Sequence, residues 1–440
     1  MSSLEVQRID CWSSCKDRNF ILLISFACIA GIMIGNIPGL LSLALLGGYA
    51  CFSSNENVIA LFFSIMLLIN PIVNAILLSM LTVIFLLKSD FRLRIYDKSG
   101  ACILVAIILW VGADILAAEN TVSAVKDVIS WLFVFCVYMI CQSFSFSTSI
   151  NKMLLGLMIG GVTVSIIYAT KILLGIETAS DYWILRIPDT NISSTILFLT
   201  IIIIDYLKSM GIINLKLSII LKGLLIFSIF LEGSRGIESL TLIYIILLIY
   251  GKRSNATQLR YLLKIAFPLG AAAGFLLICN TEFFKQTISS LASMFDSSNT
   301  SNSIRISIYK DIMLRMFPEN PICGIGPGNF EEMYYQHYAS IDFQASHAHS
   351  IFLQVLAEHG LVGFLLFSAF VVQLVSRAKV VFYNSCEFKN LYIWFIATFI
   401  FYGAIEHLFG DSRCFAFILA VFSMYKNLLK GNSKCLSICT

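Results

Sequence analysis

Long runs of apolar residues, separated by short polar segments, recur along the whole chain. A helix needs about 20 mostly apolar residues to cross roughly 30 Å of hydrocarbon. The run 57–88 is interrupted only at Asn70-Pro71, so it predicts either a helical hairpin or one long kinked helix. The pattern predicts an all-α polytopic integral membrane protein with about 12 to 14 transmembrane helices. The stretches that approach a span are 20–35, 37–52, 57–70, 72–88, 101–118, 129–147, 153–175, 191–207, 217–231, 236–250, 259–279, 358–376, 390–408 and 413–429.

The composition supports this class and excludes others. Charged residues make up only 13% of the 440 residues, against roughly 25% in an average soluble domain, so a soluble protein of this size could not cover its surface. The formal net charge of +4 provides no electrostatic basis for binding nucleic acid. The thirteen cysteines include no Cys-x-x-Cys pair, so zinc sites and redox motifs lack their basic unit.

The distribution of Lys and Arg predicts the orientation in the membrane. With the N-terminus in the cytoplasm, twenty of the thirty basic residues fall on the cytoplasmic side and four in the short outer loops. Because cytoplasmic loops carry the excess of Lys and Arg, both termini are expected in the cytoplasm. We expect three parts: transmembrane helices in 1–279, about eleven stretches, then a periplasmic loop at 280–348 and C-terminal transmembrane helices in 349–440.

The outer loop is expected to carry short amphipathic helices. Residues 307–316 place three apolar side chains at four-residue spacing, Ile308, Ile312 and Met316, which predicts one helix that Pro318 then breaks. A second short helix is expected at 330–338. The glycine-rich run 324–328 lacks the Lys-Ser/Thr of a phosphate-binding loop, so it predicts a turn.

All five histidines lie in the last quarter of the chain, four of them in one 23-residue window. An imidazole has an ordinary pKa of about 6.5 and suits proton transfer near neutrality; the alternative is a set of interfacial histidines that bind lipid headgroups. His347-Ala348-His349 could contribute to a metal site, but no carboxylate or thiol stands beside it at usual ligand spacing. We therefore predict no metal site.

Two arginines stand out on the predicted outer side. Arg235 lies between two apolar runs, where its charge needs an anion or a buried partner; Glu232, Glu238 or a phospholipid phosphate are the structural alternatives. Arg305 begins the amphipathic helix, where a solvated position is the alternative. Both guanidinium groups have the planar fork that suits phosphate oxygens. A lipid-linked diphosphate whose head group faces outward is a substrate class that matches such a site.

Three motifs, in order, resemble the bacterial O-antigen ligase and polysaccharide polymerase superfamily. His349-Ser350, nine further residues and Gly360-Leu361-Val362-Gly363 match the ligase pattern His-[Asn/Ser/Gln], nine residues, Gly-x-x-Gly. Ser234-Arg235-Gly236 resembles the family's Ser-Arg-Gly. Arg305, followed by Pro318-Glu319-Asn320-Pro321 and Gly324-x-Gly326, resembles its arginine and Glu-Asn-Pro segment. The last two-fifths of the chain carry most of this similarity.

The resemblance implies an inverting, metal-independent glycosyltransferase of the bacterial inner membrane, without a cofactor, whose active site faces the periplasm. The implied donor is a glycan on undecaprenyl diphosphate. The acceptor is lipid A–core oligosaccharide for a ligase, or another lipid-linked repeat unit for a polymerase. His349 is then the general base, and Arg235 and Arg305 bind the donor diphosphate. We assign supporting roles to three further residues: His347, Glu406 and Arg413.

A transporter or flippase is an alternative from a different class. Such proteins place ionisable groups near the middle of the membrane. In this sequence Lys171, Asp205 and Lys222 stand nearer to the ends of predicted spans, and the polar residues concentrate at one face. This distribution favours chemistry at the membrane surface over transport.

Overall fold

The computed structural model describes residues 21–88, 95, 97–143, 147–174, 184–251, 300–384 and 386–424. Helices are the only elements in these ranges longer than an isolated bridge between Ile69 and Leu185. The predicted span 259–279 and the first part of the predicted outer loop, 280–299, lie outside the described residues. The all-α class expected from the apolar pattern is confirmed.

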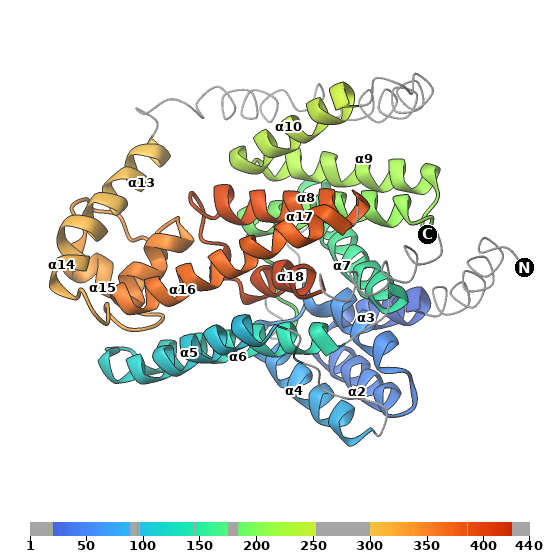
Figure 1. Ribbon diagram of the computed structural model, residues 1–440, viewed down its shortest axis with the longest axis horizontal. Coiled ribbons are helices and arrows are strands. Elements are labelled where there is room, and N and C mark those ends of the chain that lie inside the picture. Colours follow the sequence, from blue (N-terminus) through green and yellow to red (C-terminus); the bar gives the residue numbers. More distant parts are fainter. Residues whose placement is uncertain are drawn as a thin grey trace, which may run out of the picture.

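The helices of the membrane part are labelled in chain order, and the 300–348 segment stands between α10 and α16 in the sequence (Figure 1). Their bounds are Ile21–Ile34, α2 Asn36–Phe52, α3 Asn55–Met66, α4 Pro71–Leu87, α5 Lys98–Asp114, α6 Thr121–Ser143, α7 Ser147–Leu174, α8 Thr190–Ser209, α9 Leu215–Glu232, α10 Arg235–Gly251, α16 Ile351–Asn384, α17 Cys386–Ala397 and α18 Ser412–Ser423. Short segments follow several of them: the 3₁₀ turns η1 Ile115–Ala117 and η6 Leu408–Gly410, and the π-helical turn η5 Thr398–Tyr402.

Four of the described helices are long and apolar enough to cross a membrane. These are Thr121–Ser143, Ile150–Ile172, Thr190–Ser209 and Ile351–Ser376. Shorter apolar helices surround them, so the structure fits a polytopic membrane protein. The total of 12 to 14 spans stays a prediction.

The interrupted run 57–88 forms two helices, α3 and α4. The Asn70 side chain accepts a hydrogen bond from the Ile72 amide (3.0 Å), and Pro71 is the first residue of α4, where its missing N–H costs nothing. The backbone groups that the break leaves without helical partners pair with a second extended segment: the Asn70 amide donates to the Ile184 carbonyl (2.8 Å) and the Arg186 amide to the Leu68 carbonyl (2.9 Å). These bonds satisfy polar groups that hydrocarbon could not solvate.

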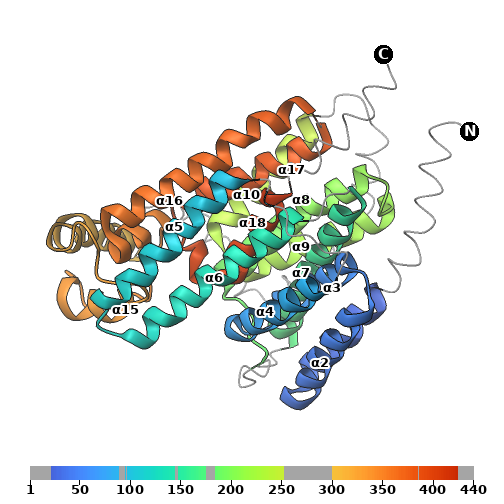
Figure 2. The same cartoon turned by 60° about the horizontal axis from the view of Figure 1, so that its bottom comes forward.

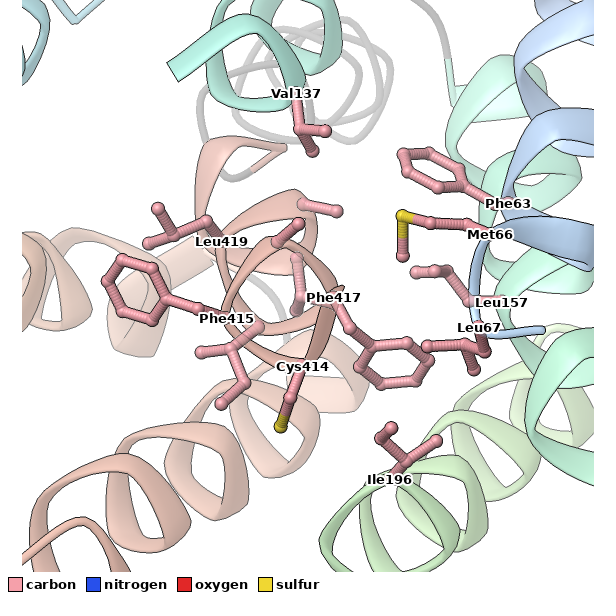
Figure 3. Close-up of a cluster of buried hydrophobic side chains, with 14 of the residues drawn as sticks. Phe63, Met66, Leu67, Val137, Leu157, Ile196, Cys414, Phe415, Phe417 and Leu419 are labelled. Atoms are coloured by element: carbon pink, nitrogen blue, oxygen red, sulfur yellow. The ribbon is translucent and has the colours of Figure 1, made fainter. Parts of the chain in front are cut away.

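The helix α18 lies at the centre of the apolar core. Every residue from Ser412 to Ser423 is buried, as expected of a helix that is hydrophobic around most of its circumference. Figure 3 shows Phe417 directed toward side chains of α3 and Leu67, while Phe415 points to the opposite side. Helices from both ends of the sequence therefore share one core.

The segment 300–348 folds into short helices at one end of the molecule (Figure 1). They are α13 Thr300–Asp311, the π-helical η3 Ile312–Met316, α14 Phe317–Glu319, α15 Phe330–Met333 and the π-helical η4 Tyr334–Tyr338. The predicted apolar face is confirmed, because Ile308, Ile312 and Met316 are fully buried in a small core of their own. The first helix begins earlier than expected, at Thr300, and helical structure continues past Pro318 because this proline occupies the first turn of α14.

This segment packs on the ends of α5, α6 and α16, which run side by side (Figure 2). The glycine run forms the contact. Gly326 and Gly328 have positive φ angles and lie so close to Ala118 and Ser123 that a Cβ atom on either would come within 3 Å of the α5–α6 turn. The run is the turn that the sequence predicted, and its glycines also allow close packing of backbone on backbone.

The Gly-x-x-Gly motif marks a kink in α16. Gly360 has φ 62° and ψ −162°, which interrupts the helix after two and a half turns. The carbonyls of Ala357 and Glu358 accept instead from the amides of Ile325 and Gly326, both at 3.0 Å. The Leu361 amide, which the kink also frees, donates to the Pro321 carbonyl (2.8 Å). The Glu-Asn-Pro segment and the kinked helix are thus built to fit each other.

Candidate active site

A single buried carboxylate, Glu406, joins four elements that lie far apart in the sequence. It stands between η5 and η6 and is 3% exposed. One oxygen lies 3.3 Å from the His347 Nε2 atom and 3.5 Å from the His349 Nδ1 atom. The other accepts from Arg305 (3.3 Å) and from the Asn191 amide group (2.9 Å). Four predicted site residues therefore meet at one point: the base His349, the diphosphate ligand Arg305, and the supporting residues His347 and Glu406.

The start of α16 holds the two histidines in place. Ser350, the second residue of the histidine motif, accepts a weak hydrogen bond (3.4 Å) from the Leu353 amide and so caps the helix. Gln354 accepts from the Ala348 amide (2.7 Å), and the Ile351 amide donates to the Gly403 carbonyl (2.8 Å). These bonds fix the motif against the turn that carries Glu406.

His349 has an unusual backbone conformation. Its φ is 49°, and it is the only non-glycine residue with positive φ in the described part of the chain. A non-glycine residue in this region is strained, and such strain is often found at functional sites. The Tyr309 hydroxyl of α13 donates to the His349 carbonyl (2.8 Å). The contact joins α13 directly to the histidine motif.

The two histidines differ in which nitrogen remains open. Their rings lie 4.4 Å apart. His347 has partners on both nitrogens, the Ser346 hydroxyl (2.8 Å) at Nδ1 and Glu406 at Nε2. The His349 Nδ1 atom faces Glu406 at 3.5 Å but forms no hydrogen bond in the described part of the chain, and its Nε2 has no partner among the described residues. Only His349 can offer a free ring nitrogen to a substrate without breaking an existing contact.

The electrostatics keep Glu406 ionised and His407 neutral. Burial alone would raise the pKa of the Glu406 carboxyl, but the hydrogen bond from His347, the nearby imidazole of His349 and the charge of Arg305 outweigh it, so this pKa lies well below its usual range. Burial, followed by the charge of His347, lowers the pKa of His407 to about 3. The site thus contains one fixed negative charge surrounded by cationic and titratable groups.

Arg305 retains capacity for a further anion. Its Nε atom is buried and has no hydrogen-bond partner among the described residues, while its side chain is 27% exposed. A guanidinium has five N–H donors, so the contact with Glu406 leaves donors for phosphate oxygens.

Arg235 stands next to the same turn at the start of α10. The hydroxyls of Ser234 and Tyr402 are 3.1 Å apart, and a Cβ atom on Gly236 would come within 2.5 Å of the Tyr402 ring. The Ser-Arg-Gly motif therefore packs on the residues that precede Glu406, and its small members allow this approach. Glu232, one alternative partner for Arg235, accepts from the hydroxyls of Ser193 and Ser194 at 2.8 and 2.5 Å.

Arg413 lies elsewhere and is bound to the protein itself. Its side chain is 1% exposed. The guanidinium donates to the Asp411 carboxylate and to three main-chain carbonyls, those of Leu67 (3.1 Å), Ile69 (3.0 Å) and Arg186. These contacts favour a structural role at the break between α3 and α4, and a role in catalysis stays a prediction.

Two residues that contact the site, Asn191 and Tyr309, were not predicted from the sequence, because neither belongs to a motif.

A possible set of metal ligands was not predicted either: His347, His349 and Glu406 place ligand atoms within 4.8 Å of one another. Glu406 follows His347 by 59 residues, so no local spacing could indicate it. Arg305 already contacts this carboxylate, and its charge opposes a metal cation at the same place.

Part of the chain is similar to one known protein family. Residues 220–368 match the family model described as O-antigen ligase. No curated protein matches the chain. The matched segment, about a third of the chain, includes Arg235, Arg305 and the histidine motif. It supports an activity of the O-antigen ligase or polymerase type, and it confirms the resemblance of this chain to the O-antigen ligase-like superfamily.

Proposed function

We propose that the protein is an O-antigen ligase-like inverting glycosyltransferase. It moves a glycan from undecaprenyl diphosphate to the lipid A–core oligosaccharide at the periplasmic face of the bacterial inner membrane. The observation that carries the proposal is the convergence of His349, Arg305 and Glu406, because a base, a phosphate-binding fork and an orienting carboxylate are what this transfer needs. The family match at 220–368 supports the same class of reaction.

His349 is the base in this proposal. A sugar hydroxyl is a poor nucleophile at neutral pH, so a positioned base must accept its proton as the new bond forms. The acceptor oxygen attacks the anomeric carbon from the face opposite the diphosphate, the bond from that carbon to the phosphate oxygen breaks, and the configuration inverts. The open Nε2 atom of His349 takes the proton, while Glu406 beside Nδ1 stabilises the imidazolium that results.

The two arginines stabilise the leaving group. Negative charge builds on the diphosphate as the glycosidic bond breaks, and guanidinium groups fixed in a site of low dielectric lower the energy of that state. Arg305 approaches from the 300–348 segment and Arg235 from the start of α10. Catalysis in this scheme uses side chains of the chain itself and no metal ion or cofactor.

The acceptor decides between ligase and polymerase. The same site would serve a polymerase of O-antigen or exopolysaccharide, with a second lipid-linked repeat unit as acceptor. The lipopolysaccharide of a deletion strain separates the two. Core without any O-antigen, with polymer accumulating on the undecaprenyl carrier, supports the ligase. Core that carries a single repeat unit contradicts the ligase and supports the polymerase. Binding of lipid-linked glycan without turnover would instead favour a polysaccharide transporter or flippase.

A further inference from the structure

A second group of ionisable side chains, separate from Glu406 and its neighbours, is buried where α5, α6 and α16 meet. It consists of Asp114 at the end of α5, Asp127 in the second turn of α6, and Glu358 and His359 just before the kink in α16. The side chains of Asp114 and His359 are 3% and 4% exposed. The proposed reaction uses none of these four residues.

The histidine lies between two carboxylates. The His359 Nδ1 atom is 3.6 Å from an Asp114 oxygen, and its Nε2 atom is 3.7 Å from an Asp127 oxygen. Charge-assisted hydrogen bonds of this kind usually measure about 2.7 to 2.9 Å. The Oδ2 atoms of Asp114 and Asp127 and the Nδ1 atom of His359 lack a hydrogen-bond partner in the described part of the chain. The spacing is too long for direct bonds and leaves three buried polar atoms unsatisfied.

Carboxyl groups also outnumber cationic side chains in this group. Three carboxylates and one imidazole share a buried space, and no Lys or Arg among the described residues forms an ion pair with any of them. Burying carboxylates without a compensating cation costs several kcal/mol each. A cation bound beside Asp127 and Glu358 would remove this cost and would satisfy the open oxygen of Asp127.

The geometry points to a divalent transition-metal site, and we propose that Asp127, Glu358 and His359 bind a Zn²⁺ or Mn²⁺ ion. Ligand atoms of these three residues lie within 4.8 Å of one another. Around a tetrahedral ion with bonds of about 2.1 Å, ligands are roughly 3.4 Å apart, so small side-chain movements close the site. An imidazole nitrogen favours Zn²⁺ over Mg²⁺ or Ca²⁺, and the two carboxylates also suit Mn²⁺. Asp114, beside the other ring nitrogen, orients the histidine, as carboxylates next to metal-bound histidines commonly do.

The role of this ion would be structural. Glu358 accepts from the Phe330 amide (3.2 Å) with its carboxylate and from the Gly326 amide (3.0 Å) with its carbonyl. The Trp110 indole donates to the His359 carbonyl (3.2 Å). The ion would therefore hold three helices and the 300–348 segment together at one point. This inference does not depend on the proposed transfer reaction.

Metal binding by the full-length protein in detergent, with any affinity tag removed, tests the proposal. The protein is treated with a chelator, dialysed, titrated with Zn²⁺ or Mn²⁺, and assayed for bound metal by mass spectrometry and for thermal stability. We expect one ion per chain and a higher Tm with metal. Glu358→Gln and His359→Gln should weaken binding at least about 100-fold, and Asp114→Asn roughly 10- to 100-fold.

The double variant His347→Gln/His349→Gln is the matched control, since it removes the other histidine pair beside a carboxylate. It should bind the ion as the wild type does. If the wild-type protein binds neither metal, or if the control loses the ion while His359→Gln retains it, the proposal is wrong. The wild-type titration tests the proposal even if the His359→Gln variant fails to fold. Metal binding by Asp114→Asn is then compared with metal binding by the control.

Discussion

Replacing Glu406 by Gln should lower the turnover of glycan transfer by about 10²- to 10³-fold. The substitution keeps the size of the side chain and removes its charge. At the 3.5 Å that separates Glu406 from His349, a unit charge stabilises an imidazolium by about 5 kcal/mol at an effective dielectric constant of 20. Because His349 is 21% exposed and Arg305 remains nearby, we expect about 3 to 4 kcal/mol, which corresponds to the stated loss.

The assay is in vitro transfer with purified protein and a lipid-linked donor. Glu332→Gln is the control, because Glu332 is an exposed carboxylate of α15 whose side chain contacts Asn120 (3.2 Å), and it should retain wild-type turnover. Since Glu406 acts through His349, the double variant Glu406→Gln/His349→Ala should be no slower than His349→Ala alone. Full activity of Glu406→Gln, or additive losses in the double variant, would refute the role of this carboxylate.

Three further predictions follow from charge and topology. Arg235→Ala and Arg305→Ala should abolish transfer at unchanged protein level, whereas the Lys variants keep the charge, lose the fork and retain partial activity; normal transfer by either Ala variant removes that arginine from the diphosphate site. His407 has a pKa of about 3 in the folded protein and about 6.5 in the unfolded chain. Between these two values the unfolded chain binds more protons than the folded protein, so acidification lowers the free energy of unfolding by up to about 1.4 kcal/mol per pH unit. His407→Gln should therefore lose less Tm than the wild type between pH 6.5 and 4.5, and equal losses would contradict the assignment. A reporter fused after Ser298 should behave as exported and one fused after Lys434 as cytoplasmic; the opposite pattern would overturn the proposed mechanism, because donor and acceptor meet outside.

Elements of the fold were predictable from the sequence where residues close together in the chain determine them. The apolar runs indicate helices because a chain in hydrocarbon must satisfy its own backbone. The spacing of Ile308, Ile312 and Met316 indicates a buried face. The pairing of the α3–α4 break with residues 184–186 was not predictable, because it depends on two segments more than a hundred residues apart.

The candidate site was predictable only in its motif residues. His349 and Arg305 stand in recognisable patterns, and Glu406 was predicted only as a supporting residue. That Glu406 contacts both histidines and Arg305 follows from the packing of α13 and α16 against the η5–η6 turn. The cluster of Asp114, Asp127, Glu358 and His359 was not predicted for the same reason, since its carboxylates come from α5, α6 and α16 and share no regular spacing in the sequence.

Transfer by two matched histidine variants tests the central claim most directly. His347→Ala and His349→Ala each remove one imidazole next to the same carboxylate, and each is assayed with purified protein, lipid-linked donor and acceptor. The account predicts that His349→Ala folds normally but turns over roughly 10²- to 10⁴-fold more slowly, while His347→Ala keeps most of its activity. A His349→Ala enzyme at the wild-type rate, or an inactive His347→Ala enzyme beside an active His349→Ala enzyme, would contradict it.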